Sequence, residues 1–308
     1  MPRRAGRSYW ILLLSLAAIW GASYLFIKVA VRDLEPSVLM CARALIAAAL
    51  LLPYITWKLG GRAAAEQLRG AWREVIVLGA INAAIPFTLV AWGETHIDSS
   101  VAGIAQATVP LFSVLVGLWL LPHEPISTER WAGIALGIVG VGVLVGLDPT
   151  GGWWAVAGTL AVVLSSLSYA SAGIYGQLRV ATVPGPVLAA GSMLVGGVLL
   201  LPFALVQLPP QAPGWKATAS LLALAVLGTA FAQLVLFRLL ATAGARRTSL
   251  VTFLMPVFAL AYGATLLGEP ITTAAVLGLV LILGGVALGS GARRRRARAV
   301  AGATATGR

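Results

Sequence analysis

Long, continuously apolar runs fill almost the whole chain, and they restrict its fold more than any other feature. About 20 predominantly apolar residues are needed to cross the hydrocarbon core of a bilayer. Only 10% of the 308 residues are Asp, Glu, Lys or Arg, and the mean hydropathy is +0.92, whereas about a quarter of a typical soluble domain is charged. The composition excludes a soluble enzyme and a nucleic-acid-binding domain, and it predicts an integral membrane protein.

The apolar runs divide into ten segments of membrane-crossing length. They are long and continuous rather than short and alternating, which favours helices over a barrel. The predicted spans are residues 9–31, 36–57, 74–92, 100–121, 128–147, 152–178, 184–207, 216–241, 248–267 and 271–290. We therefore expect an all-α membrane protein of ten transmembrane helices joined by short connections.

The basic residues predict an orientation in the bilayer. With the N-terminus in the cytoplasm, 17 of the 22 Lys and Arg residues fall in cytoplasmic segments, 3 fall outside, and Arg43 and Arg238 lie within spans. The positive-inside rule then predicts a multi-pass protein of the inner or plasma membrane with both termini cytoplasmic. The net charge of +12 is interpreted as this topology signal and not as a sign of nucleic-acid binding. Residues 291–308 are expected to form a basic cytoplasmic tail.

Short motifs recur in the same order in the two halves of the chain. The segment Glu124-Pro125-Ile126-Ser127-Thr128 matches Glu269-Pro270-Ile271-Thr272-Thr273 at an offset of 145 residues, and residues 51–54 match 200–203 at an offset of 149. This predicts two five-helix repeats, residues 1–147 and 152–290. Because five is odd, the second repeat must cross the membrane in the opposite sense. Inverted repeats are typical of transporters with a site between the halves; a duplicated scaffold without a transport role is the alternative.

Several of these motifs together carry a family resemblance. The first span contains Trp20-Gly21-Ala22-Ser23-Tyr24-Leu25-Phe26, the second contains Pro36 and Arg43, and the fourth and ninth contain Pro110 and Pro256, each followed by a Glu-Pro pair. With the repeat, this resembles the EamA-type branch of the drug/metabolite transporter superfamily. The resemblance implies an inner-membrane permease with a central cavity, often an exporter of amino acids or other metabolites.

Residues for covalent or cofactor chemistry are missing from the sequence. None of the three Lys residues lies in a P-loop context, and neither His96 nor His123 belongs to a His-Glu-x-x-His motif. The single Cys41 excludes an intramolecular disulfide and a Cys-based metal site. We therefore predict no catalytic residue, no metal and no cofactor.

The carboxylates bear on the solute class. All ten lie in loops or at span ends, whereas proton relays and sites for cationic drugs normally use a buried acid. This favours a neutral, zwitterionic or anionic solute and disfavours coupling through a deep carboxylate. Facilitated diffusion, exchange, and coupling through Glu124 and Glu269 all stay open. The resemblance makes amino acids or related compounds the leading class; a multidrug or lipid-linked exporter, and a non-transporting enzyme or sensor, are the alternatives.

Polar side chains near the middle of the spans are the candidates for a cavity. Arg43 either faces a cavity or snorkels and caps neighbouring carbonyl groups. Trp20 and Ser23 share one helix face, and Ser165 lies at a similar depth. Each polar side chain either joins helices or contacts a solute. The predicted cavity residues are Trp20, Ser23, Arg43, Asn82, Gln106, Tyr169, Gln233 and Thr252.

Two further features predict motion and packing. Pro110 and Pro256 are expected to bend or hinge the fourth and ninth spans. The fifth and tenth spans each contain glycines four residues apart, for example Gly133 with Gly137 and Gly285 with Gly289. This spacing predicts tight helix packing, with a homodimer contact as the alternative. The expected partners are a small-molecule solute and the lipid bilayer.

Overall fold

The computed structural model describes residues 6–120, 127–146 and 152–305, and within these ranges the chain is helical with no strand. The helices of the first half are α1 (Arg7–Ala30), α2 (Pro36–Leu59), α3 (Gly61–Gly70), α4 (Trp72–Gly79), η1 (Ala80–Ala84), α5 (Ile85–Glu94), α6 (Ser99–Gln106), α7 (Val109–Leu120) and α8 (Thr128–Gly146). Those of the second half are α9 (Gly152–Arg179), α10 (Gly185–Val206), α11 (Trp215–Ala225), η2 (Val226–Phe231), α12 (Ala232–Ala243), α13 (Ala245–Thr248), α14 (Val251–Tyr262), η3 (Gly263–Leu267) and α15 (Thr273–Ala305). The predicted all-α class is confirmed.

The apolar helices agree with most of the predicted spans. Eight helical segments in the described part of the chain are long and apolar enough to cross a membrane. Val251–Leu267 and Thr273–Gly289, at the positions of the last two predicted spans, are shorter apolar helices, so the count of ten stays a prediction. Two elements were not predicted: α3, a short helix between the second and third spans, and the extension of α15 beyond residue 290.

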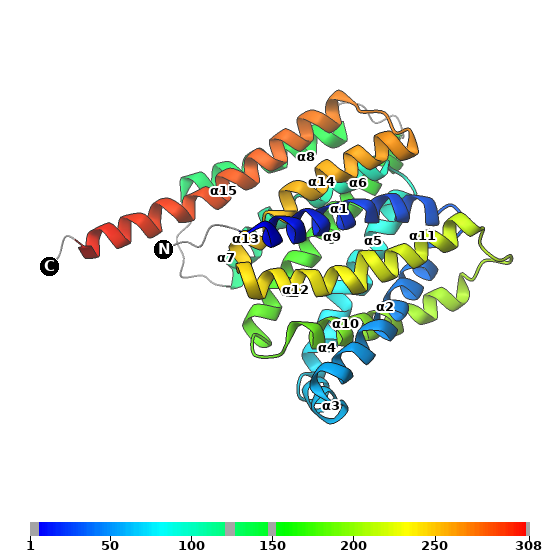
Figure 1. The fold of residues 1–308 in the computed structure, drawn as a ribbon. Helices are drawn as coiled ribbons and strands as arrows, with labels where there is room; N and C mark the ends of the chain where they lie inside the picture. The colour runs from blue at the N-terminus through cyan, green and yellow to red at the C-terminus, as the bar shows by residue number, and fades with distance from the viewer. Residues whose placement is uncertain (1–5, 121–126, 147–151, 306–308) are drawn as a thin grey trace.

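The helices form one bundle with two distinguishable ends (Figure 1). We call the end where α1 begins, next to α13, the proximal end. We call the opposite end, where residues 31–35, 95–98, 207–214 and 268–272 connect the helices, the distal end. The contacts follow the repeat. The second span of each half packs against its counterpart, α2 against α10, and the fifth does the same, α8 against α15. The first span of each half packs on the fourth of the other, α1 on α14 and α9 on α7.

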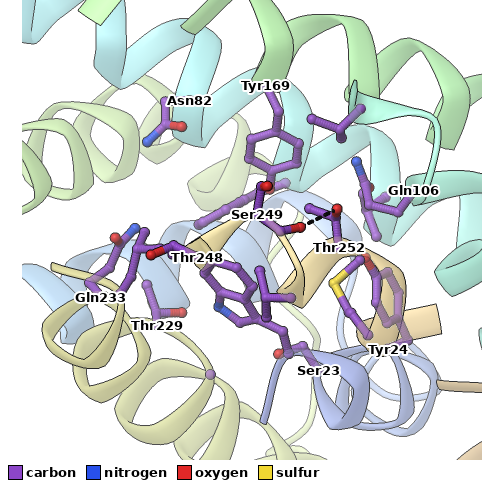
Figure 2. Close-up of a pocket in the computed structure, with 18 of the residues that line it drawn as sticks. Ser23, Tyr24, Asn82, Gln106, Tyr169, Thr229, Gln233, Thr248, Ser249 and Thr252 are labelled. Atoms are coloured by element: carbon purple, nitrogen blue, oxygen red, sulfur yellow. Dashed lines mark hydrogen bonds between the residues drawn. The ribbon is translucent and has the colours of Figure 1, made fainter. Parts of the chain in front are cut away.

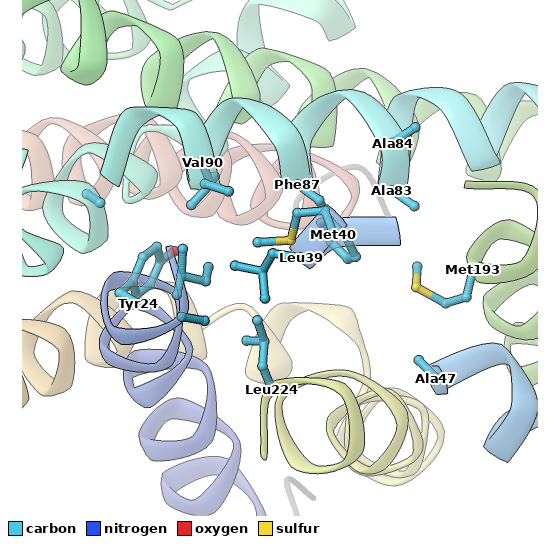
Figure 3. Packing of buried hydrophobic residues seen from close by; sticks show 14 of the residues in the cluster. Tyr24, Leu39, Met40, Ala47, Ala83, Ala84, Phe87, Val90, Met193 and Leu224 are labelled. Atoms are coloured by element: carbon cyan, nitrogen blue, oxygen red, sulfur yellow. The ribbon is translucent and has the colours of Figure 1, made fainter. Parts of the chain in front are cut away.

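The core beside the cavity is made of large apolar side chains (Figure 3). Leu39 and Met40 of α2 and Leu224 of α11 are completely buried, and Phe87 of α5 and Tyr24 of α1 lie in the same cluster. Lipid tails are as apolar as these side chains, so their contribution comes mainly from close van der Waals packing. The core therefore fixes the positions of α1, α2, α5 and α11 around the cavity.

Glycines allow α8 and α15 to approach backbone to backbone. A Cβ atom on Gly285 would lie 2.5 Å from the Gly133 carbonyl oxygen and 2.8 Å from the Gly137 nitrogen. Backbone atoms cannot rotate away as a side chain can, so only glycine fits here. The packing interpretation of Gly133 and Gly285 therefore agrees with the structure, while the homodimer stays a prediction.

Gly285→Val is expected to force α8 and α15 apart and to destabilise the protein by roughly 1–3 kcal/mol, the usual range for overpacking. The measurement is the melting temperature of the purified protein in detergent, followed by tryptophan fluorescence. Gly142→Val is the matched control, because a Cβ atom on Gly142, also on α8, meets nothing within 4 Å. Equal melting temperatures for the two variants would contradict the packing argument.

Candidate solute-binding cavity

Interrupted helices surround the centre of the bundle. The third and eighth spans each contain a π-helical segment, η1 and η2, and the fourth span is split between α6 and α7 at Ala107 and Thr108. Pro86 follows η1 by two residues and has no backbone N–H to donate, which favours a widened turn before it. Irregular backbone at membrane depth is tolerated where it lines a cavity. The segments η1 and η2 contribute residues to the cavity lining, and so do Gln106 and Val109 on either side of the split.

One cavity of about 410 Å³ lies between the two halves (Figure 2). This volume is within the range of roughly 300–1,000 Å³ that is usual for small-molecule sites. All eight residues predicted from the sequence line it: Trp20, Ser23, Arg43, Asn82, Gln106, Tyr169, Gln233 and Thr252. The structure thus brings residues of seven spans to one place, and their role in binding a solute stays a prediction.

Arg43 is the charged residue of this cavity. Its side chain is 8% exposed, its Nε donates to Thr229 Oγ1 at 2.9 Å, and its guanidinium lies 3.8 Å from the centre of the Phe87 ring. Thr229 in turn donates to the Leu224 carbonyl oxygen at 2.9 Å. Arg43 forms no ion pair with a carboxylate of the described residues. The guanidinium is therefore held in place without a counter-charge, which favours the cavity-facing interpretation over snorkelling.

The uncharged polar residues of the cavity fall into two groups. Gln106 is already engaged: its Nε2 donates to Ser166 Oγ at 2.9 Å and its Oε1 accepts from Ser165 Oγ at 3.0 Å, so it joins α6 to α9. Ser23 and Thr252 donate to backbone carbonyl oxygens of their own helix regions. In contrast, no group of the described residues hydrogen-bonds to the side chains of Trp20, Asn82, Tyr169 or Gln233. Polar groups are therefore available to a solute on four side chains, Trp20, Asn82, Tyr169 and Gln233.

The cavity extends towards the proximal end. Its lining includes Ala245 and Ser249, which are exposed at the connection between α12 and α14. At the other end its lining stops at Ile27 and Val90, and it contains none of the distal connections. The described structure is therefore open towards the proximal end and closed towards the distal end.

Three contacts join the two halves at the distal end. The Glu269 carboxylate accepts hydrogen bonds from the backbone nitrogens of Ser99 and Ser100 at 2.8 and 2.9 Å, and so caps the N-terminus of α6. The Gly214 nitrogen donates to Asp33 Oδ2 at 2.9 Å, and the Ser37 hydroxyl donates to Gln207 Oε1. Burial raises the pKa of the nearby Asp98 carboxyl, with a smaller contribution from the negative charge of Glu269.

Glu269→Ala is expected to leave the two α6 nitrogens without their acceptor and to destabilise the protein by about 1–2 kcal/mol, as loss of a helix cap does. Glu269→Gln should recover part of this, because one amide oxygen can still accept. Thermal unfolding of the purified variants measures the effect. Glu66→Ala is the control, since Glu66 is exposed and pairs only along α3, with Arg62 at 3.7 Å. An unchanged melting temperature for Glu269→Ala would exclude the capping role.

The remaining predicted residues have mixed positions. Pro110 is the second residue of α7, just beyond the interruption of the fourth span, where a missing N–H is tolerated. Pro256 instead lies within the uninterrupted helix α14. Motion at either proline stays a prediction. Glu124 lies outside the described residues. Glu269 is placed as a cap between the halves, and a coupling role for it stays a prediction.

Sequence reasoning missed Phe87, Thr229 and Glu94. Phe87 and Thr229 hold Arg43, and their spacing from Asn82 and Gln233 on the same spans was the available signal. Glu94 lies at the end of a span, as predicted, but its side chain is 0% exposed, and burial of an acid at this position was not predicted. The sequence at the end of an apolar run does not indicate whether the last residue faces water or neighbouring helices.

A helical membrane bundle with a central cavity and interrupted helices is the architecture of a secondary transporter. The model of the EamA-like transporter family matches residues 8–146 and 156–290, and the chain belongs to this family. No group of three or more His, Cys, Asp or Glu side chains able to hold a metal ion occurs in the described part of the chain.

The similar proteins agree with this class. An uncharacterized transporter of Archaeoglobus fulgidus is 27% identical over 277 residues, covering 90% of this chain and 96% of its own. The uncharacterized transporter YoaV of Bacillus subtilis is 24% identical, covering 89% and 94%. The uncharacterized inner membrane transporter YedA of Escherichia coli is 28% identical, covering 61% and 59%. A crystal structure that shares 21% identity has the same fold, with a TM-score of 0.65 over 93% of this chain and 99% of the other. The protein is thus a multi-pass membrane transporter.

Proposed function

We propose that the protein exports a small, carboxylate-bearing metabolite, with amino acids and related compounds as the leading class. The observation that carries this proposal is Arg43, a buried guanidinium in the cavity with no carboxylate partner among the described residues. A buried charge is costly unless it is paired, so an anionic group of the solute is the natural partner. Aromatic rings of Trp20 and Tyr169 and the amides of Asn82 and Gln233 surround the remaining space.

Alternating access between the two repeats is the proposed mechanism. The described state, with its cavity open at the proximal end, receives the solute; opening of the distal contacts and closure of the proximal end release it on the other side. The 17:3 distribution of basic residues supports a cytoplasmic proximal end with both termini inside. Interrupted helices at the cavity support local bending as the halves rock.

An efflux panel in intact bacteria tests the proposal. Cells that overexpress the protein are loaded with amino acids, dipeptides, purines, sugar phosphates and cationic dyes, and efflux is compared with a vector control. Faster efflux of amino acids or other carboxylates is expected. Efflux of cationic dyes alone would overturn the proposal, because an unpaired cation in the cavity repels them.

A further inference from the structure

Glu94 has a fully buried carboxyl group that is not part of the cavity. It is the last residue of α5, its side chain is 0% exposed, and neither carboxyl oxygen has a hydrogen-bond partner in the described part of the chain. It does not line the cavity, but Val90, one helical turn earlier on α5, does. Glu94 therefore lies one turn beyond the distal limit of the cavity.

A lysine next to Glu94 does not neutralise it directly. Lys28 Nζ donates to the backbone carbonyl oxygens of Glu94 and Ile97 at 2.8 and 2.7 Å, and it forms no ion pair with the Glu94 carboxyl. Lys28 thus ties α1 to the connection between α5 and α6 through the main chain. The titratable and charged groups that interact electrostatically with the Glu94 carboxyl are Tyr24, Lys28, Arg43 and Glu269.

Protonation of the Glu94 carboxyl removes the charge that is otherwise buried without a partner. Taking an ionised carboxylate out of water without hydrogen bonds is far more costly than taking out a neutral carboxylic acid, although the neutral acid also loses its hydrogen bonds to water. The site around Glu94 is closed by the distal contacts of Glu269 with α6 and of Lys28 with the α5–α6 connection. Opening of the distal end separates these elements and admits water, and hydration then stabilises the ionised form.

We propose that the Glu94 carboxyl is a proton-binding site whose occupation is required for the distal end to close. Uptake of a proton forms one O–H bond on a carboxyl oxygen, and distal opening returns that proton to water. The second part of this inference rests on the alternating access proposed above. The first part, that Glu94 holds a proton in the closed state, is independent of any solute.

Infrared spectroscopy of the purified protein at neutral pH tests the proton directly. The wild type is expected to show the C=O stretch of a protonated carboxylic acid, shifted in heavy water, and Glu94→Gln is expected to lack it. Glu66→Gln and Asp98→Asn are the controls and should keep it: Glu66 is exposed, and Asp98 is only partly buried. Absence of the band from the wild type, or its persistence in Glu94→Gln, would overturn the proposal whatever the outcome of the efflux panel.

Labelling at the distal end tests the link to closure. Ile97→Cys is introduced into a Cys41→Ala background, and its reaction rate with a maleimide is followed against pH in the purified protein. Ile97 is 7% exposed, so labelling requires opening. Maleimides react with the thiolate, so each rate is divided by the rate of the same variant unfolded in denaturant at the same pH. Because the closed state holds one proton more, this rate ratio should rise with pH by up to about tenfold per pH unit. Glu94→Gln, which resembles the protonated acid, should keep a low rate ratio at every pH, and Glu94→Asp should restore the pH dependence of the ratio. The same pH dependence in Glu94→Gln would refute the link to closure.

Discussion

Arg43→Ala is expected to lower carboxylate efflux by roughly 30-fold or more. Removing one partner of a buried charged contact typically costs about 2–5 kcal/mol, and about 1.4 kcal/mol corresponds to a factor of ten. Arg43 Nε is held by Thr229 Oγ1 at 2.9 Å, and the guanidinium lies over Phe87, so its position in the cavity is preorganised. The measurement is the initial efflux rate in intact bacteria at matched membrane abundance.

Two substitutions separate the charge of Arg43 from its packing. Arg43→Gln keeps a donor for Thr229 but carries no charge, so it should export as poorly as Arg43→Ala. Arg43→Lys keeps the charge without the planar donor array, so it should retain part of the activity. Arg62→Ala, an exposed position on α3, is the control and should behave as the wild type. Full efflux by Arg43→Gln would show that the charge plays no part in solute binding.

The helical membrane fold was accessible from the sequence because its signals are local. Each crossing requires about 20 apolar residues whatever its neighbours are, and a polar side chain such as Asn82 or Gln233 is costly in lipid unless it faces the interior. Faces of different helices that avoid lipid must meet, which is why polar residues scattered over the chain line one cavity. The glycines of α8 and α15 could be assigned to packing for the same local reason.

Features that depend on several helices at once could not be predicted. Glu94 is buried where Lys28 of α1 reaches its backbone carbonyl oxygen and Glu269 of the second half caps the following helix α6. The sequence of α5 does not indicate either contact. The split at Ala107 and Thr108 contains no glycine, so the fourth span appeared continuous with a bend at Pro110. Arg43 could be assigned to neither a cavity nor a cap until Phe87 and Thr229 were placed around it.

An engineered disulfide across the distal end is expected to stop transport. Asp33 follows α1 in the first half, and Gly214 precedes α11 in the second. Gly214 N donates to Asp33 Oδ2 at 2.9 Å, and a Cβ atom on Gly214 would lie at the same distance from that oxygen. Such a short contact is within reach of a disulfide between Asp33→Cys and Gly214→Cys. Both positions are exposed, so oxidant and reductant can reach them.

Oxidation of the double variant should hold the distal end closed and reduce efflux to the vector background, and a reductant should restore it. Alternating access requires this result, because a solute taken up at the proximal end has no exit while the halves are joined distally. The native Cys41 is buried and is replaced by alanine to exclude other disulfides. The single variants Asp33→Cys and Gly214→Cys should be insensitive to oxidant. Undiminished efflux by fully cross-linked protein would rule out distal opening between α1 and α11 as a step of the transport cycle.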